Sequence, residues 1–216
     1  SHLHDQVKQI SMLRQSEKLT AGDLTDFESM AIESAAMVLR NLQRADELVR
    51  SFKQVAVDQS SEQIRKFNLR TYIDEIMLSL QPKLKLTRHK IVIDCPEDIV
   101  LDTNPAAIYQ TLINLVMNSL IHGFEYIKEG EIRIDVTVQG DNIMFVYSDN
   151  GCGMPEDVRM QIFDPFFTTR RGRGGTGLGM HIVYNLVTHS LRGRIKVAST
   201  LEQGTSTLIT LPYQPS

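Results

Sequence analysis

Two clusters of glycine within residues 149–180 constrain this chain more than any other feature. The first follows Asp149 (Asp-Asn-Gly-Cys-Gly), and the second spans residues 174–179 (Gly-Gly-Thr-Gly-Leu-Gly). Glycine permits positive φ angles and lets a ligand approach the backbone closely. Free backbone N–H groups at the start of a helix can cradle phosphate oxygens. The pattern therefore predicts a nucleotide site, with the base near Asp149 and the phosphates near residues 174–179.

Two common nucleotide-binding motifs are excluded. Gly172-x-Gly174-x-x-Gly177 matches the dinucleotide fingerprint, but polar residues precede it and the first acidic residue after it is Glu202. That fingerprint needs a strand directly before it and an acidic residue about 20 positions further on. No Gly-x-x-x-x-Gly-Lys-Ser/Thr occurs either. The chain is therefore neither a Rossmann protein nor a P-loop protein.

Composition narrows the function classes further. The 216 residues are 42% hydrophobic, which is enough for a core, and the net charge of −3 does not point to nucleic acid or to an anionic membrane. Cys95 and Cys152 lack the spacing of a zinc site or a disulfide framework, which fits a reducing compartment. No apolar run approaches the ~20 residues of a membrane span. We expect a cytoplasmic domain, whose parent protein would reach the inner membrane only through segments outside this sequence.

Residues 1–58 are polar and rich in helix formers, and they predict a helical hairpin that is part of a dimerisation region. Residues 18–25 interrupt the helical pattern, and Thr25 or Asp26 is expected to cap the second helix. After this, apolar positions alternate in steps of three and four over three heptads: Ala35, Val38, Leu42, Ala45, Val49, Phe52 and Ala56. We expect this seam to pair with a second copy of the chain. A long helix that lies on its own domain is the alternative.

The polar connector 59–66 is expected to separate the hairpin from a second domain, residues 59–216. Asn104 or Thr103 should cap a helix there with Pro105 at its first position, and residues 140–142 predict a hairpin turn. Alternating strands have one polar face, so helices should cover only the other face. We therefore expect an α/β fold, a two-layer α/β sandwich with a mixed sheet. Its helices are predicted at 69–84, 104–122 and 178–187, and its strands at 90–94, 99–101, 132–138, 143–147, 195–198 and 206–211.

Three polar side chains recur at i, i+4 and i+8 in the middle helix: Asn114, Asn118 and His122. On a regular α-helix they share one face, and buried polar groups need partners. A magnesium–triphosphate group is one such partner, because an amide oxygen suits a hard cation. A solvated stripe or a buried hydrogen-bond network is the alternative. The isolated histidines are interpreted as structural or surface residues; they are His89, His181 and His189.

These pieces stand in the order of a known family. Residues 114–122 resemble the N box of the GHKL (Bergerat-fold) ATP-binding superfamily, and residues 149–153 resemble its G1 box. Residues 163–169 are similar to the F box of sensor histidine kinases, and residues 175–179 to the G2 box. The resemblance covers residues 60–214. It implies the Bergerat ATP-binding fold and, because the F box is particular to that branch, the catalytic domain of a sensor histidine kinase.

The resemblance implies a role for each matching residue. Asp149 would accept a hydrogen bond from the adenine amino group, and Asn118 would ligate Mg²⁺. Asn114 and His122 would line the phosphates, and Arg170 would neutralise the γ-phosphate. The catalytic set implied by the family is thus Asn114, Asn118, His122 and Arg170. The other implied nucleotide contacts are Gly151, Gly153, Phe163, Thr169, Gly175, Thr176, Gly177, Leu178 and Gly179, and the segment 164–176 would form a mobile lid.

The function implied by the resemblance is transfer of the ATP γ-phosphate to a histidine and then to an aspartate on a response-regulator receiver domain. The family also implies a homodimer through the N-terminal helices. An acceptor histidine is normally followed by an acid and, five residues on, by proline. His4-Asp5 is the one His-acid pair, and no proline follows it. We therefore expect the acceptor to lie upstream of Ser1.

Two other functions remain open. A hydrolysing GHKL ATPase, of the gyrase, MutL or chaperone type, uses a glutamate base where Asn114 stands, so the sequence disfavours it. A nucleotide-gated interaction module would bind ATP and engage a partner without chemistry. A phosphotransfer assay separates such a module from a kinase.

Overall fold

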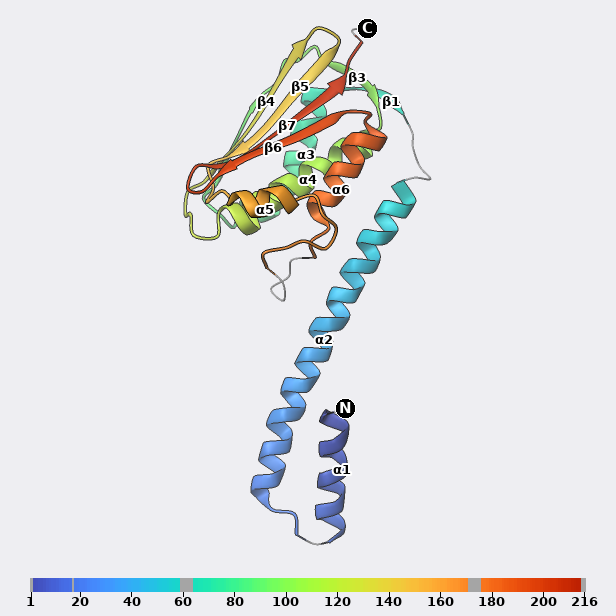
Figure 1. Cartoon of the computed structure of the whole chain (residues 1–216), viewed down its shortest axis with the longest axis vertical. Helices are drawn as coiled ribbons and strands as arrows, with labels where there is room; N and C mark the ends of the chain where they lie inside the picture. The colour runs from blue at the N-terminus through green and yellow to red at the C-terminus, as the bar shows by residue number, and fades with distance from the viewer. Residues whose placement is uncertain (1, 17, 59–63, 171–175, 215–216) are drawn as a thin grey trace. The chain divides into compact units, whose positions relative to one another are not determined.

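The structure is a computed structural model of the chain, and it describes residues 2–16, 18–58, 64–170 and 176–214 (Figure 1). The chain divides into two compact units, residues 1–52 and 53–216. The first holds helix α1 (His2–Gln15) and most of α2 (Ala21–Asp58), which confirms the predicted helical hairpin. The predicted domain boundary between residues 58 and 59 stays a prediction.

Helix α2 begins earlier than predicted, at Ala21, because Thr20 and Asp23 form a reciprocal cap. The backbone N–H of Asp23 donates to Thr20 Oγ1 over 3.2 Å, and the backbone N–H of Thr20 donates to Asp23 Oδ2 over 2.9 Å. Such a capping box satisfies two N–H groups that the first turn leaves unpaired. The prediction that Thr25 or Asp26 caps this helix is wrong, since Thr25 lies inside it.

The second unit is built on a five-stranded mixed sheet with strand β5 at its centre. One pair of neighbours, β2 and β4, is parallel, and the other pairs are antiparallel. This arrangement confirms the predicted mixed sheet, and the turn between β4 and β5 lies where it was predicted. The strand order is β2 (Lys90–Asp94), β4 (Glu131–Gln139), β5 (Asn142–Asp149), β7 (Gly204–Pro212) and β6 (Arg194–Thr200).

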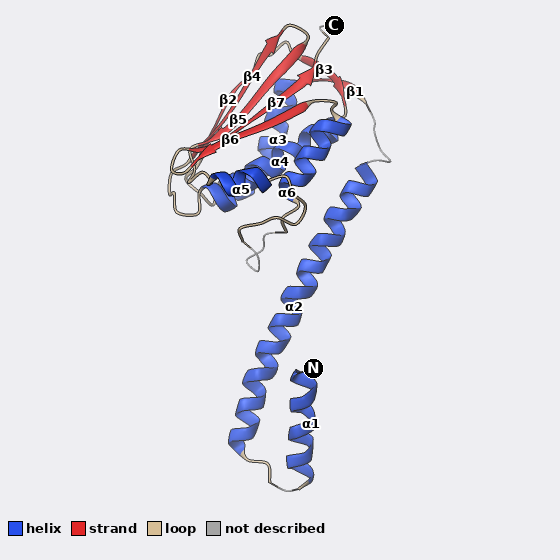
Figure 2. Ribbon diagram, viewed as in Figure 1, coloured by secondary structure: helices blue, strands red, loops and turns tan. Residues whose placement is uncertain are grey.

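Three helices cover one face of this sheet: α3 (Leu69–Leu84), α4 (Pro105–Asn118) and α6 (Gly179–Asn185) (Figure 2). The alternating apolar residues of the strands point to them, and burial of each large side chain contributes about 1.5–3 kcal/mol. This confirms the predicted two-layer α/β sandwich. The side chains that meet in the core include Ile73, Ile76, Leu112, Val116, Ile132, Ile134, Ile143, Phe145, Val183 and Ile209.

Helix α4 begins as predicted but ends differently. Asn104 Oδ1 accepts hydrogen bonds from the N–H groups of Ala106 and Ala107, and Pro105 occupies the first turn. After Asn118 the chain widens into a π-helical turn, η1 (Ser119–Gly123). The predicted regular helix up to residue 122 is therefore wrong in its last turn, because sequence periodicity does not show a local switch to i→i+5 hydrogen bonds.

A separate two-stranded sheet joins β1 (Arg65–Asn68) to β3 (Val100–Thr103) in antiparallel register. The predicted strand at 99–101 is shifted toward its C-terminal end, and the end of the predicted connector 59–66 is part of β1. Residues 59–63 of that connector lie outside the described residues. Asn68 also caps α3, since its Oδ1 accepts from the Thr71 N–H over 2.8 Å.

Candidate functional site

Asp149, the last residue of the central strand β5, is held by a short hydrogen-bond chain. Ser119 Oγ donates to Asp149 Oδ2 over 2.6 Å, and the Tyr147 hydroxyl lies 2.8 Å from the same Ser119 Oγ. The Gly151 N–H donates to Asp149 Oδ1 over 2.9 Å. Burial raises the pKa of Tyr147, which keeps its hydroxyl protonated as a donor. The carboxylate is therefore fixed in orientation, and each oxygen keeps acceptor capacity for a further hydrogen bond.

Two glycines next to this carboxylate, Gly151 and Gly153, are packed so closely that neither position has room for a side chain. A Cβ atom on Gly151 would lie 2.7 Å from Asp149 Oδ1 and 2.7 Å from the Gly123 carbonyl oxygen. The Cys152 N–H donates to that same carbonyl over 2.8 Å. Gly153 is equally confined, by the carbonyl of Thr200. The end of η1 and the predicted G1 box are thus in direct contact, and the glycines let them approach.

Asn118 meets the start of α6. A Cβ atom on Gly179, the first residue of that helix, would lie 3.6 Å from Asn118 Oδ1. Just before the helix, the N–H of Leu178 donates to Thr176 Oγ1 over 3.3 Å. The structure therefore brings the predicted N box and the end of the predicted G2 box together. Gly175 belongs to the same prediction but lies outside the described residues.

Asn114 carries an unsatisfied donor. Its Oδ1 accepts from Gln110 Nε2 over 3.4 Å, whereas its Nδ2 is buried and finds no hydrogen-bond partner within the described part of the chain. A buried donor without a partner costs about 1–3 kcal/mol. The amide is thus suited to donate to an oxygen of a bound group, one turn before Asn118.

His122 lies beyond the start of the π-helical turn, so it does not continue the regular i, i+4 row of Asn114 and Asn118. Burial and the nearby Arg170 charge lower the pKa of His122, and Glu125 partly opposes this. The neutral imidazole is therefore favoured. Arg170 forms an ion pair with Glu125, and the two side chains are 20% and 32% exposed.

The predicted F box packs against α6 and the G2 box. His181 Nδ1 donates to the Phe163 carbonyl oxygen over 2.9 Å, and the Phe163 ring lies 5.3 Å from the Tyr184 ring. A Cβ atom on Gly177 would lie 2.5 Å from the Phe166 carbonyl carbon. Thr169 is exposed. Most of the predicted lid can be placed, but residues 171–175 fall outside the described residues.

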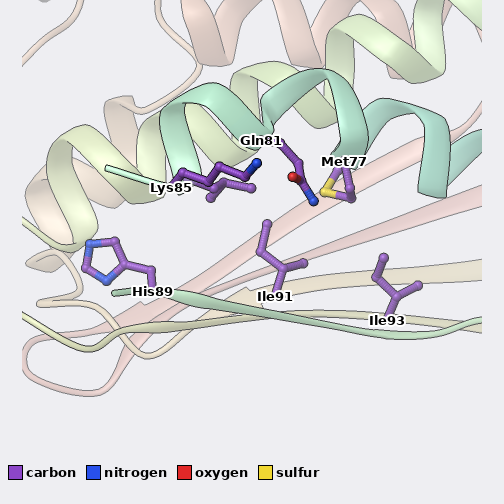
Figure 3. Close-up of a pocket in the computed structure, with 7 residues that line it drawn as sticks. Met77, Gln81, Lys85, His89, Ile91 and Ile93 are labelled. Atoms are coloured by element: carbon purple, nitrogen blue, oxygen red, sulfur yellow. The ribbon is translucent and has the colours of Figure 1, made fainter. Parts of the chain in front are cut away.

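A groove elsewhere in this unit, of about 380 Å³, contains none of the predicted site residues. It lies between α3 and the edge strand β2, where Met77 and Gln81 point toward Ile91 and Ile93 (Figure 3). Its lining is mainly apolar, and it has no acidic group to read a base. Arg70 also reaches from α3 to the Ile93 carbonyl oxygen over 3.5 Å. The groove therefore does not coincide with the nucleotide site that the sequence predicts around Asp149.

Comparison with known proteins identifies the family. A profile of the family described as "Histidine kinase-, DNA gyrase B-, and HSP90-like ATPase" matches residues 103–215, which is more than half of the 216 residues. The chain belongs to this ATPase family. The matched region contains the carboxylate of Asp149, the amide of Asn118 and the glycines around them. Membership of the GHKL ATPases implies that the domain uses a nucleotide.

Curated relatives of this chain include proteins named as kinases. The circadian input-output histidine kinase CikA of Synechococcus elongatus is 30% identical over 170 residues, which are 74% of this chain and 22% of the relative. Sporulation kinase B of Bacillus subtilis is 24% identical over 212 residues, 97% of this chain and 47% of the relative. The chain thus spans between about a fifth and about half of the length of these relatives.

Solved structures agree with the fold. The catalytic domain of the histidine kinase ThkA superposes with a TM-score of 0.62 at 27% identity, over 71% of this chain and 97% of that domain. The Acinetobacter baumannii histidine kinase AdeS, at 16% identity and a TM-score of 0.60, covers 99% of this chain and 98% of its own and shares the fold. The predicted GHKL ATP-binding domain of the sensor-histidine-kinase type is confirmed.

Two further properties come from searches of the described residues. In residues 2–16, 18–58, 64–170 and 176–214, no cluster of three or more His, Cys, Asp or Glu side chains is arranged to hold a metal ion. No helix in the same ranges is long and apolar enough to cross a membrane.

Sequence reasoning missed three residues that shape this site: Ser119, Tyr147 and Glu125. Ser119 lies within the predicted helix 104–122 and Tyr147 within the predicted strand 143–147, and neither was predicted to support Asp149. The hydrogen-bond chain from Tyr147 through Ser119 to Asp149 depends on how η1 packs against β5, which no local pattern shows. The acidic side chain of Glu125 follows His122 by three positions, and its partner Arg170 is far away in sequence.

Proposed function

We propose that this chain binds Mg²⁺ and ATP and acts as the catalytic domain of a sensor histidine kinase in the cytoplasm. The observation that carries the proposal is that Ser119, directly after Asn118, hydrogen-bonds the Asp149 carboxylate. The Asn118 amide also lies beside Gly179, and the unpaired Asn114 Nδ2 lies one turn before it. The family and the kinase relatives support the same function.

Asp149 is suited to recognise adenine. Its two oxygens are already oriented by Ser119 and Gly151, so they are ready to accept a hydrogen bond from the adenine amino group. Guanine presents a carbonyl oxygen at the equivalent position, and two acceptors facing each other lose this bond. A site built to hydrogen-bond one group discriminates strongly against a ligand that lacks it.

The other end of the site suits a magnesium–triphosphate group. Mg²⁺ usually takes one or two protein oxygens together with phosphate oxygens, which fits the amide oxygen of Asn118. The bound cation would neutralise phosphate charge. Asn114 Nδ2 and the neutral ring of His122 would contact phosphate oxygens, and Arg170 would pair with the γ-phosphate. Residues 175–179, the predicted G2 box, would bind the phosphates through their backbone N–H groups.

The chemistry is an in-line phosphoryl transfer. A lone pair on the acceptor imidazole forms a bond to the γ-phosphorus, and the bond from that phosphorus to the bridging oxygen breaks to release ADP. The imidazole proton passes to a neighbouring carboxylate, and positioning together with positive charge supplies most of the rate. Asn114 offers no base to activate water, which disfavours hydrolysis.

The phosphotransfer proposal is tested with [γ-³²P]ATP on the chain joined to any native sequence that precedes Ser1. We expect label that is labile in acid and stable in alkali on a histidine, and no label in the Asp149→Asn variant. Peptide mapping tells His4 from an upstream histidine; we expect the upstream one. ATP binding without any label would contradict kinase activity and favour a nucleotide-gated interaction module.

A response-regulator receiver domain is the proposed next acceptor of the phosphoryl group. Structural work on the histidine kinase ThkA includes a complex with the response regulator protein TrrA, and that ThkA chain shares the fold of this one at 21% identity. Relay from histidine to aspartate follows from the kinase function proposed here.

A homodimer through the N-terminal helices is proposed from unpaired apolar side chains. Val38 and Leu42 lie on the predicted seam of α2 and are 55% and 63% exposed in the single chain. We expect Val38→Glu with Leu42→Glu to give a monomer in sedimentation velocity, and Met12→Glu, an exposed position on α1, to leave the dimer intact. If the unsubstituted chain sediments as a monomer at high micromolar concentration, this proposal fails.

A further inference from the structure

The ion pair between Arg170 and Glu125 joins two parts of the site. Glu125 follows η1 at the end of the predicted N box, and Arg170 follows the predicted F box. Each acts on His122, whose pKa the positive charge lowers and the negative charge raises. The three side chains therefore form one electrostatic cluster, which we call the Arg170 cluster, at the phosphate end of the site.

We propose that Glu125 is a positioning residue that holds Arg170 beside the phosphate end of the site and competes with the terminal phosphate for it. The inference rests on the proposed function, in which Arg170 pairs with the γ-phosphate. A guanidinium binds carboxylate and phosphate oxygens with the same planar donors, so a γ-phosphate replaces Glu125 as its partner. ADP has no γ-phosphate and leaves the pair in place.

The low exposure of the Arg170 and Glu125 side chains strengthens their ion pair, so replacing Glu125 by a phosphate has an energetic cost. At 20% and 32% exposed, the pair is less screened than the exposed pair of Arg88 with Glu129, whose side chains are 80% and 72% exposed. Exposed pairs contribute little to stability, and part-buried pairs with a charged hydrogen bond contribute more. ATP has to break the pair of Arg170 with Glu125 before its γ-phosphate can bind Arg170, and this cost lowers the affinity for ATP. ADP leaves the pair in place, so its affinity carries no such cost.

The test compares ATP and ADP affinities of Glu125→Gln by calorimetry in the presence of Mg²⁺. We expect the ratio Kd(ADP)/Kd(ATP) to rise by about fivefold, which corresponds to ~1 kcal/mol. Glu129→Gln is the matched control: it removes the same charge four positions away, from the exposed pair with Arg88. That control should leave the ratio at the value of the unsubstituted chain.

A double-mutant cycle shows whether Glu125 acts through Arg170. Loss of a negative charge near the phosphates strengthens the binding of both nucleotides by simple electrostatics, with or without Arg170. The exchange of partners needs the guanidinium. ATP carries one more negative charge than ADP, so this electrostatic effect alone raises the ratio slightly. In an Arg170→Ala background, Glu125→Gln should therefore raise the ratio by much less than it does when Arg170 is present.

The outcomes separate this inference from the proposed function. If the unsubstituted chain does not bind ATP, the proposed function fails. If it binds ATP and Glu125→Gln leaves the ratio unchanged or lowers it, the competition is overturned. A rise of the same size in the Arg170→Ala background also overturns it. Should Glu125→Gln fail to fold by circular dichroism, Glu125→Asp carries the same test, because the shorter side chain weakens the ion pair. Its ratio is expected to change in the same direction, and an unchanged ratio again overturns the inference.

Discussion

Asp149→Asn is expected to weaken ATP binding by at least about 100-fold, or ~2.7 kcal/mol, while the domain stays folded. The carboxylate accepts from Ser119 Oγ and from the Gly151 N–H. An amide in its place has one acceptor where two are needed, and it turns an N–H₂ donor toward either Ser119 Oγ or the Gly151 N–H, where the adenine amino group would also have to find its acceptor. A charged hydrogen bond is lost and a donor is left facing a donor.

The measurement is a calorimetric titration with Mg-ATP, with circular dichroism to confirm the fold. Asp135→Asn is the matched control, because Asp135 is a strand residue of the same sheet whose carboxylate pairs with Arg133 over 2.9 Å. It should bind ATP as the unsubstituted chain does. Unchanged affinity in Asp149→Asn would show that the base is read elsewhere.

Gly204→Ala is expected to destabilise the catalytic domain by about 3 kcal/mol or more, at the upper end of single substitutions. Gly204 has a φ of +85°, and a Cβ atom there would lie 1.9 Å from the Asp149 carbonyl oxygen. Backbone atoms of β5 cannot move aside without breaking the pairing of β5 with β7, in which Asp149 lies opposite Thr205. The clash therefore reaches the strand that positions the site.

Urea unfolding followed by circular dichroism measures this loss. Gly140→Ala is the control, because Gly140 also has positive φ, at +57°, but a Cβ atom there meets nothing within 4 Å. It should lose only about 1–2 kcal/mol for the left-handed backbone. Equal losses in the two variants would mean that backbone strain alone, and not the contact with Asp149, determines the cost at Gly204.

The catalytic domain was largely predictable because its core elements are long and regular. Strand β4 alternates apolar and polar residues from Ile132 to Val138, and β5 buries every second side chain from Ile143 to Tyr147. Helices α3 and α4 repeat apolar residues at helical spacing. Asn104 with Pro105 is a strong helix start. Such elements have one buried face, and the face leaves a periodic trace in the sequence.

The elements that were missed are short or irregular. Helix α5 (Glu156–Gln161) has six residues and none of them is buried, so it leaves no apolar period. Strand β1 has four residues and pairs outside the main sheet. The π-helical turn η1 changes the hydrogen-bond pattern without a change in composition. Thr20 and Asp23, in contrast, were readable as a capping box and were passed over in favour of later residues.

The sequence motifs of the candidate site could be identified from the sequence, but the contacts between their side chains could not. The residues Asn118, Asp149 and Gly179 are identified from motifs, because each motif is local. The support that Asp149 receives from Ser119 and Tyr147, and the pairing of Arg170 with Glu125, join segments that are 28 or more residues apart. Long-range pairing of this kind depends on sheet register and on the packing of η1, and a single sequence does not record it.

A calorimetric titration of this chain with ATP and with GTP, each with Mg²⁺, tests the central claim most directly. The account predicts saturable binding of ATP at a single site, and affinity for GTP weaker by at least about 100-fold, because the Asp149 acceptor then faces a carbonyl oxygen. Absence of ATP binding, or equal affinity for the two nucleotides, would contradict it.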